Sequence, residues 1–224
     1  MPVDPKADIE ITAFGWVPDM AKGLVKDLRV RWALEEAGLP YRVRLLHAMQ
    51  KPADYVQQQP FNQVPCLRQG DLTIFESGAI LQYIGEQSET LLPRDPRGRF
   101  AAIQWTYAAL NSLEPFIQHR VLLDSIYAGE EWARLAKPRA DELARLRLNQ
   151  LSQRLGDRDW LEGDRFTIGD LLTVTVLRIA DRGKLLEPGS NLAAYLSRGQ
   201  ARPAFQSALA DHLADFTLTE GVAA

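Results

Sequence analysis

The chain contains 224 residues with a mass of 25.2 kDa, a size that suits one large domain or two small ones. Hydrophobic residues make up 46% of the chain and charged residues 25%, which is typical of folded globular domains. The net charge of −3 provides no basic surface for a phosphate backbone, so we expect no nucleic-acid partner.

Three further features narrow the class of protein. The single cysteine excludes an internal disulfide framework, and the N-terminal residues lack the pattern of a signal peptide, so we expect a cytoplasmic protein. No apolar run approaches the roughly 20 residues that a membrane-spanning helix needs, so we expect no membrane role. The histidines His47, His119 and His212 lack a metal-ligand spacing, and we expect no metal site.

The beginning of the chain predicts a strand followed by a helix. Apolar and polar residues alternate over 9–13, as they do in a strand with one buried face. Val25, Leu28 and Trp32 then follow at the spacing of an amphipathic helix, which we expect to stop at Gly38.

The next segment predicts the rest of a small mixed sheet. A strand over 41–45 and a short helix over 52–59 precede a hairpin with strands over 66–68 and 72–75, and another helix starts at Ser77. Strand, helix, strand implies a parallel pair, and the hairpin adds antiparallel strands. The predicted arrangement is a thioredoxin-like domain with a four-stranded sheet and helices on its faces.

The remainder of the chain predicts helices only. The segment LLPRDPRG has two prolines, a glycine and no periodicity, as in a linker. Apolar periodicity over 100–110 and 148–155 indicates helices, and Thr167 and Asp170 have the spacing of a capping box before an apolar run. We therefore predict a thioredoxin-like domain over 1–88, a linker over 89–98 and an all-helical domain over 99–224.

The most informative segment is residues 61–84, FNQVPCLRQGDLTIFESGAILQYI. A cis bond between Val64 and Pro65 would direct the backbone N–H and C=O of Val64 towards a ligand. Ser77 at a helix start offers a hydroxyl and free N–H groups to a carboxylate, and Glu76 offers a carboxylate to an ammonium group. Each feature alone is also an ordinary strand edge or helix cap, but together they predict a site for the charged end of an α-amino acid.

Five segments occur in an order that resembles the glutathione transferase superfamily: ALEEAGLPY, QVP, ESGAILQYI, LLPRDP and FTIGDLL. The resemblance implies that the backbone of Val64 binds the cysteinyl part of glutathione, and that Glu76 and Ser77 hold its γ-glutamyl end. It also implies that Gln63 and Lys51 meet the glycyl end, although Lys51 also fits a solvated surface lysine.

The residue that activates the thiol of glutathione is not evident. Members of the superfamily stabilise the thiolate with a Tyr, Ser or Cys near the start of the first helix, whereas residues 14–28, FGWVPDMAKGLVKDL, contain no Tyr, Ser, Cys or Thr. Trp16 could donate its indole N–H or stack on the ligand, and Lys22 could stabilise a thiolate by its charge. Stabilisation by backbone N–H groups and the helix end is an equal alternative.

The resemblance implies a glutathione transferase that uses glutathione as co-substrate and joins its sulfur to a small hydrophobic electrophile held near Trp16 and Tyr107. The missing activator leaves open a non-catalytic binding or regulatory protein, and a glutathione-dependent isomerase or peroxidase is a third alternative. We also expect a two-fold homodimer, as the resemblance implies.

Overall fold

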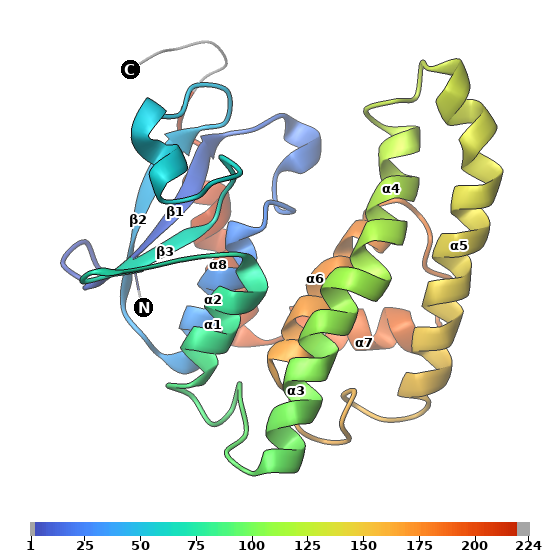
Figure 1. Ribbon diagram of the computed structural model, residues 1–224. Coiled ribbons are helices and arrows are strands. Elements are labelled where there is room, and N and C mark those ends of the chain that lie inside the picture. The colour runs from blue at the N-terminus through green and yellow to red at the C-terminus, as the bar shows by residue number, and fades with distance from the viewer. Residues whose placement is uncertain (1–2, 219–224) are drawn as a thin grey trace. The chain divides into compact units, whose positions relative to one another are not determined.

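The computed structural model describes residues 3–218, which form two compact units (Figure 1). The sheet unit comprises the chain up to Leu91 together with the residues from Arg202 onwards, and the helical unit comprises Leu92–Ala201. The contacts thus group the last helix with the sheet, whereas the division expected from the sequence assigns it to the helical part. Among the described residues, no helix is both long and apolar enough to cross a bilayer.

The sheet unit contains the four-stranded mixed sheet that the sequence predicts. Its strands are β1 (Ile9–Trp16), β2 (Tyr41–His47), β3 (Cys66–Gln69) and β4 (Leu72–Phe75). The strand order is β2-β1-β3-β4, with β1 and β2 parallel and the other neighbouring pairs antiparallel. β1 continues beyond the expected residues 9–13 because Phe14 and Trp16 still pair with β2, across a register shift.

Within the described part of the sheet unit, three α-helices and two 3₁₀ helices accompany the sheet. These are η1 (Asp19–Ala21), α1 (Asp27–Ala37), η2 (Ala53–Gln57), α2 (Ser77–Gly85) and α8 (Pro203–Ala214). α1 packs against both α2 and α8 (Figure 1). α1 ends at Gly38 as expected, in a left-handed conformation with φ of 65° that favours glycine. α1 begins at Asp27, so Val25 lies before the helix. The prediction that Val25 belongs to this helix is therefore wrong.

The helical unit confirms the prediction that only helices follow the linker. Its helices are α3 (Pro96–Ala108), the π-helical turn η3 (Ala109–Leu113), α4 (Glu114–Asp124), α5 (Glu131–Leu155), α6 (Ile168–Arg182) and α7 (Asn191–Gln200). α6 contacts α3, α4 and α7, and it is buried along most of its length (Figure 1). The wider turn of η3 ends two residues before Pro115, whose missing N–H cannot join a regular helical ladder.

The predicted capping box forms at the start of α6. The Thr167 hydroxyl accepts from the Gly169 N–H at 3.2 Å, and Asp170 Oδ2 accepts from the Thr167 N–H at 3.0 Å. The other Asp170 oxygen accepts from the Leu161 N–H at 2.9 Å and from the Tyr195 hydroxyl at 2.8 Å. Because these groups are buried, the box ties the loop before α6 and helix α7 to the core of the helical unit.

Candidate functional site

The candidate site lies in the sheet unit, where β3 begins and β4 ends. Cys66 at the start of β3 pairs with Phe75 at the end of β4, so Val64, which precedes β3, and Glu76 and Ser77, which follow β4, leave the hairpin at the same end. The Val64–Pro65 peptide bond is cis. Within residues 3–218, the backbone N–H and C=O of the buried Val64 have no hydrogen-bond partner. A peptide-like ligand can therefore pair with both groups.

Glu76 and Ser77 supply groups that bind ligands of opposite charge. Glu76 is exposed and has a φ of 68°, which is rare for a residue with a side chain and typical of positions under functional constraint. Ser77 is the first residue of α2, whose initial N–H groups have no partners within the helix and favour an anion. The site can thus hold a carboxylate and an ammonium group side by side.

The structure corrects one expectation about Ser77. The sequence suggests a helix cap, but the residue preceding α2 is Glu76, and no side-chain cap hydrogen bond forms there. The buried Ser77 hydroxyl instead accepts from Arg29 Nη1 at 3.3 Å. Sequence reasoning missed Arg29 because its role depends on the packing of α1 against α2, which local periodicity does not reveal.

The residues expected at the glycyl end, Gln63 and Lys51, make different kinds of contact: Gln63 through its backbone and Lys51 through its side chain. The Gln63 side chain is exposed, while its carbonyl accepts from the Tyr55 hydroxyl at 2.8 Å and its N–H donates to Gln59 Oε1 at 3.0 Å. The Lys51 ammonium donates to the Ala48 carbonyl and lies 5.1 Å from the ring centroid of Phe14. Partial burial lowers the pKa of Lys51.

The two candidate catalytic residues are each engaged by a neighbour. The half-buried ring of Trp16 stacks on His47 with a centroid separation of 5.5 Å and an interplanar angle of 5°. The ammonium of Lys22 forms an ion pair with Asp19 at 2.7 Å, which offsets its charge. Lys22 is therefore a weaker stabiliser of a thiolate than its sequence position suggests.

Thr12 and Cys66 are structural residues of the sheet. The Thr12 hydroxyl lies 2.8 Å from the Tyr55 hydroxyl and accepts from the Cys66 N–H at 2.8 Å, so it is buried on the face of the sheet that carries η2. Cys66 is buried as well, and burial raises the pKa of its thiol. Cys66 therefore acts as a small buried side chain of the sheet.

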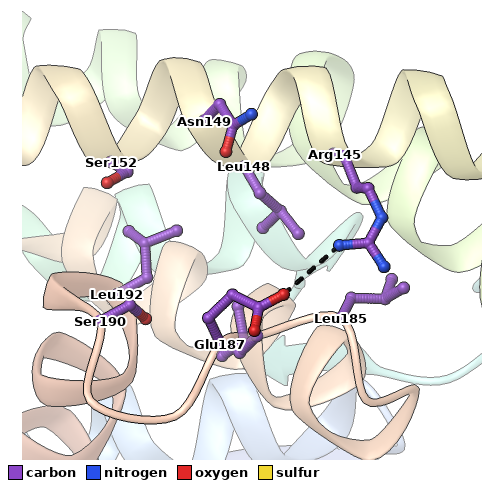
Figure 2. A pocket seen from close by; sticks show the side chains of 9 residues that line it. Arg145, Leu148, Asn149, Ser152, Leu185, Glu187, Ser190 and Leu192 are labelled. Carbon is purple, nitrogen blue, oxygen red and sulfur yellow. Dashed lines mark ion pairs between the residues drawn. The ribbon is translucent and has the colours of Figure 1, made fainter.

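The helical unit contains the remaining predicted residue and a separate cavity. Tyr107 lies on α3 with 57% of its surface exposed. A cavity of 150 Å³ is lined by residues of α5, of the segment joining α6 to α7 and of α7, including Leu148, Leu185 and Leu192 respectively (Figure 2). Arg145 and Glu187 form an ion pair there at 3.6 Å. Their side chains point towards each other in Figure 2.

The fold and the site together define a thioredoxin-like domain, with a cis-proline directly before β3, and a helical unit. Residues 12–86 match the N-terminal domain of glutathione S-transferase, and residues 123–203 match its C-terminal domain. Glutathione S-transferase GstA of Escherichia coli is 31% identical over 185 residues, which cover 79% of this chain and 89% of that protein. The chain belongs to the glutathione S-transferase family.

Two other relatives extend the comparison. The disulfide-bond oxidoreductase YfcG of Escherichia coli is 28% identical over 148 residues, which cover 62% of this chain and 68% of that protein. A crystal structure of a glutathione transferase family member from Pseudomonas fluorescens, with two glutathione bound, superposes with a TM-score of 0.79. It shares 25% sequence identity, and the match covers 90% of this chain and 92% of that one. The family thus includes proteins named both as transferases and as oxidoreductases.

Proposed function

We propose that the protein binds glutathione at the site formed by Val64, Glu76 and Ser77 and joins the whole molecule, through its sulfur, to a small hydrophobic electrophile. The observation that carries the proposal is that, within residues 3–218, nothing pairs with the backbone N–H and C=O of Val64, at the end of the hairpin from which α2 begins. A peptide backbone would complete the hydrogen bonds of Val64, while the Glu76 carboxylate would attract the α-ammonium group and Ser77 the α-carboxylate. The glutathione bound to the Pseudomonas relative supports this assignment.

The reaction requires the thiol of glutathione as its thiolate. The thiolate attacks the electrophilic carbon, a carbon–sulfur bond forms, and the leaving group departs with the bonding electron pair. Since residues 14–28 contain no hydroxyl or thiol side chain and Lys22 is paired with Asp19, we assign stabilisation of the anion to backbone N–H groups before α1. Trp16 is proposed to contact the ligand, and Tyr107 to contact the electrophile.

A second candidate reaction is the reduction of a disulfide or peroxide by glutathione. The absence of a side-chain activator from residues 14–28 favours it, because these substrates react with a less strongly activated thiol. The relative named as a disulfide-bond oxidoreductase supports it as well. In this reaction two glutathione molecules are oxidised to one disulfide for each substrate disulfide reduced to two thiols.

Calorimetric titration with glutathione tests the binding site. We expect Glu76→Gln and Ser77→Ala to weaken binding by about 1.5–3 kcal/mol, the range for hydrogen bonds to charged groups. Glu89→Gln and Ser88→Ala, which change neighbouring residues outside the site, should bind as the wild type does. Equal affinity in all four variants would remove the functional role of the Glu76–Ser77 pair.

Product analysis separates the candidate reactions. Formation of a thioether from an activated aryl chloride supports the transferase, whereas formation of oxidised glutathione from a model disulfide supports the reductase. Binding without either reaction would indicate the non-catalytic alternative. A cytoplasmic location and a two-fold homodimer complete the proposal, and light scattering at twice the chain mass of 25.2 kDa is the expected result for the dimer.

A further inference from the structure

A chain of hydrogen bonds encloses the cis peptide bond that precedes β3. The Cys66 N–H donates to the Thr12 hydroxyl at 2.8 Å, and the Tyr55 hydroxyl donates to the Gln63 carbonyl at 2.8 Å. The two hydroxyl oxygens lie 2.8 Å apart. The chain of hydrogen bonds therefore begins on the residue that follows the cis pair and ends on the residue that precedes it.

The direction of each bond follows from the number of protons available. Tyr55 has one hydroxyl proton, which the Gln63 carbonyl accepts, so the proton between the two hydroxyls comes from Thr12. The other acceptor near that proton, the Cys66 carbonyl, is more distant at 3.5 Å. Burial raises the pKa of Tyr55, so its hydroxyl keeps its proton at neutral pH. All three bonds thus donate in one direction, an arrangement in which neighbouring bonds strengthen one another.

The bond from Tyr55 determines the orientation of the N–H of Val64. The Gln63 carbonyl and the Val64 N–H belong to one planar peptide group, which is trans because the only cis bond in the described chain is the next one. The two groups therefore point in opposite directions. Since the carbonyl points at Tyr55, the Val64 N–H points away from it, and nothing in residues 3–218 pairs with it. The Gln63 N–H is held as well, by Oε1 of the buried Gln59 at 3.0 Å.

The ring of Tyr55 is fixed by its packing. The side chain is fully buried in an apolar cluster with Leu46, Val64 and Cys66. The guanidinium of Arg44 lies 5.7 Å from the ring centroid. Tyr55→Phe would therefore keep the packing and remove only the hydroxyl, which interrupts the chain of hydrogen bonds in its middle.

We propose that Tyr55 is a positioning residue, whose hydroxyl holds the peptide group before Val64 in the orientation that binds the backbone of glutathione. The inference rests on the proposed function, because it takes the N–H and C=O of Val64 as groups that bind the ligand. Without the hydroxyl, the Gln63 carbonyl loses its buried donor. It can find another only if the peptide group turns, and that rotation also turns the Val64 N–H away from the ligand.

Calorimetric titration with glutathione separates positioning from stability, because the stoichiometry reports the folded fraction and the Kd reports the site. For Tyr55→Phe we expect the Kd to rise about three- to tenfold at unchanged stoichiometry, the effect of one hydrogen bond. The matched control is Tyr83→Phe, which removes the bond from that hydroxyl to Gln69 Oε1 at 2.7 Å. Gln69 lies at the opposite end of β3, so this variant should bind as the wild type does.

A second pair of variants tests the other hydroxyl. Thr12→Val removes the hydroxyl at nearly constant shape, whereas Thr12→Ser keeps it and loses a methyl group. The bond from Tyr55 to Gln63 remains in both variants, so the effect should be smaller. We expect the Kd to rise about two- to fivefold in Thr12→Val and to stay within about twofold of the wild type in Thr12→Ser.

Other outcomes overturn the inference in distinguishable ways. Wild-type Kd values in both Tyr55→Phe and Thr12→Val would overturn it and leave the proposed glutathione site in place. Reduced stoichiometry with an unchanged Kd would mean that Tyr55 only stabilises the fold. An equal rise of the Kd in Tyr83→Phe would mean that any hydroxyl lost near the hairpin weakens binding. A wild-type protein without affinity for glutathione would overturn the proposed function and this inference with it.

Discussion

Asp170 joins three parts of the helical unit through its two carboxylate oxygens. It accepts from the N–H groups of Leu161 and Thr167 and from the hydroxyls of Thr167 and Tyr195, at 2.8–3.1 Å. Asp170→Ala leaves the two N–H groups and the Tyr195 hydroxyl buried without that acceptor. Each such group costs roughly 1–3 kcal/mol, so we expect a loss of at least about 3 kcal/mol of unfolding free energy. That loss is a large part of the stability of an ordinary domain.

Urea denaturation followed by circular dichroism measures the effect. Tyr195→Phe removes one donor and should cost about 1–2 kcal/mol, because the carboxylate keeps its other partners. The control is Asp164→Ala at a nearby exposed carboxylate, which should change stability by less than about 0.5 kcal/mol. An Asp170→Ala loss below about 1 kcal/mol would refute the argument that this carboxylate satisfies buried donors.

Two further predictions concern stability. Burial, and then the charge of Asp211, raise the pKa of Glu35 from 4.5 to about 7. The folded state therefore binds the proton more tightly, and stability should fall as pH rises from about 4.5 to about 7. Glu35→Gln should match the wild type at pH 5 and exceed it at pH 8 by about 1 kcal/mol, since partial exposure reduces the full effect; equal pH profiles would contradict this. Gly199→Ala would place a Cβ 2.6 Å from Val174 Cγ2, where α7 meets α6, and should lower the unfolding free energy by about 1–3 kcal/mol. Gly129→Ala, which meets no atom within 4 Å, is its control, and equal melting temperatures for the pair would show that α7 can shift.

Features with short-range causes could be predicted from the sequence. The capping box at Thr167 forms because its donors and acceptors lie within three residues of one another. The end of α1 at Gly38 and the hairpin turn at Gly70 follow from backbone conformations that glycine adopts without strain. The sequence leaves the isomer of the Val64–Pro65 bond open, and the structure shows that the bond is cis.

The sequence by itself predicted the four strands and those helices that carry a clear apolar period or cap, because periodicity, caps and turns act over a few positions. Only the tertiary structure decided that α8 packs on α1, where Arg202 pairs with Glu36 and the ring of Phe205 meets Trp32. The same packing brings His212 to Asp27, 185 residues earlier in the chain. A contact over such a separation leaves no local pattern, since it depends on which buried surfaces complement each other once the chain has folded.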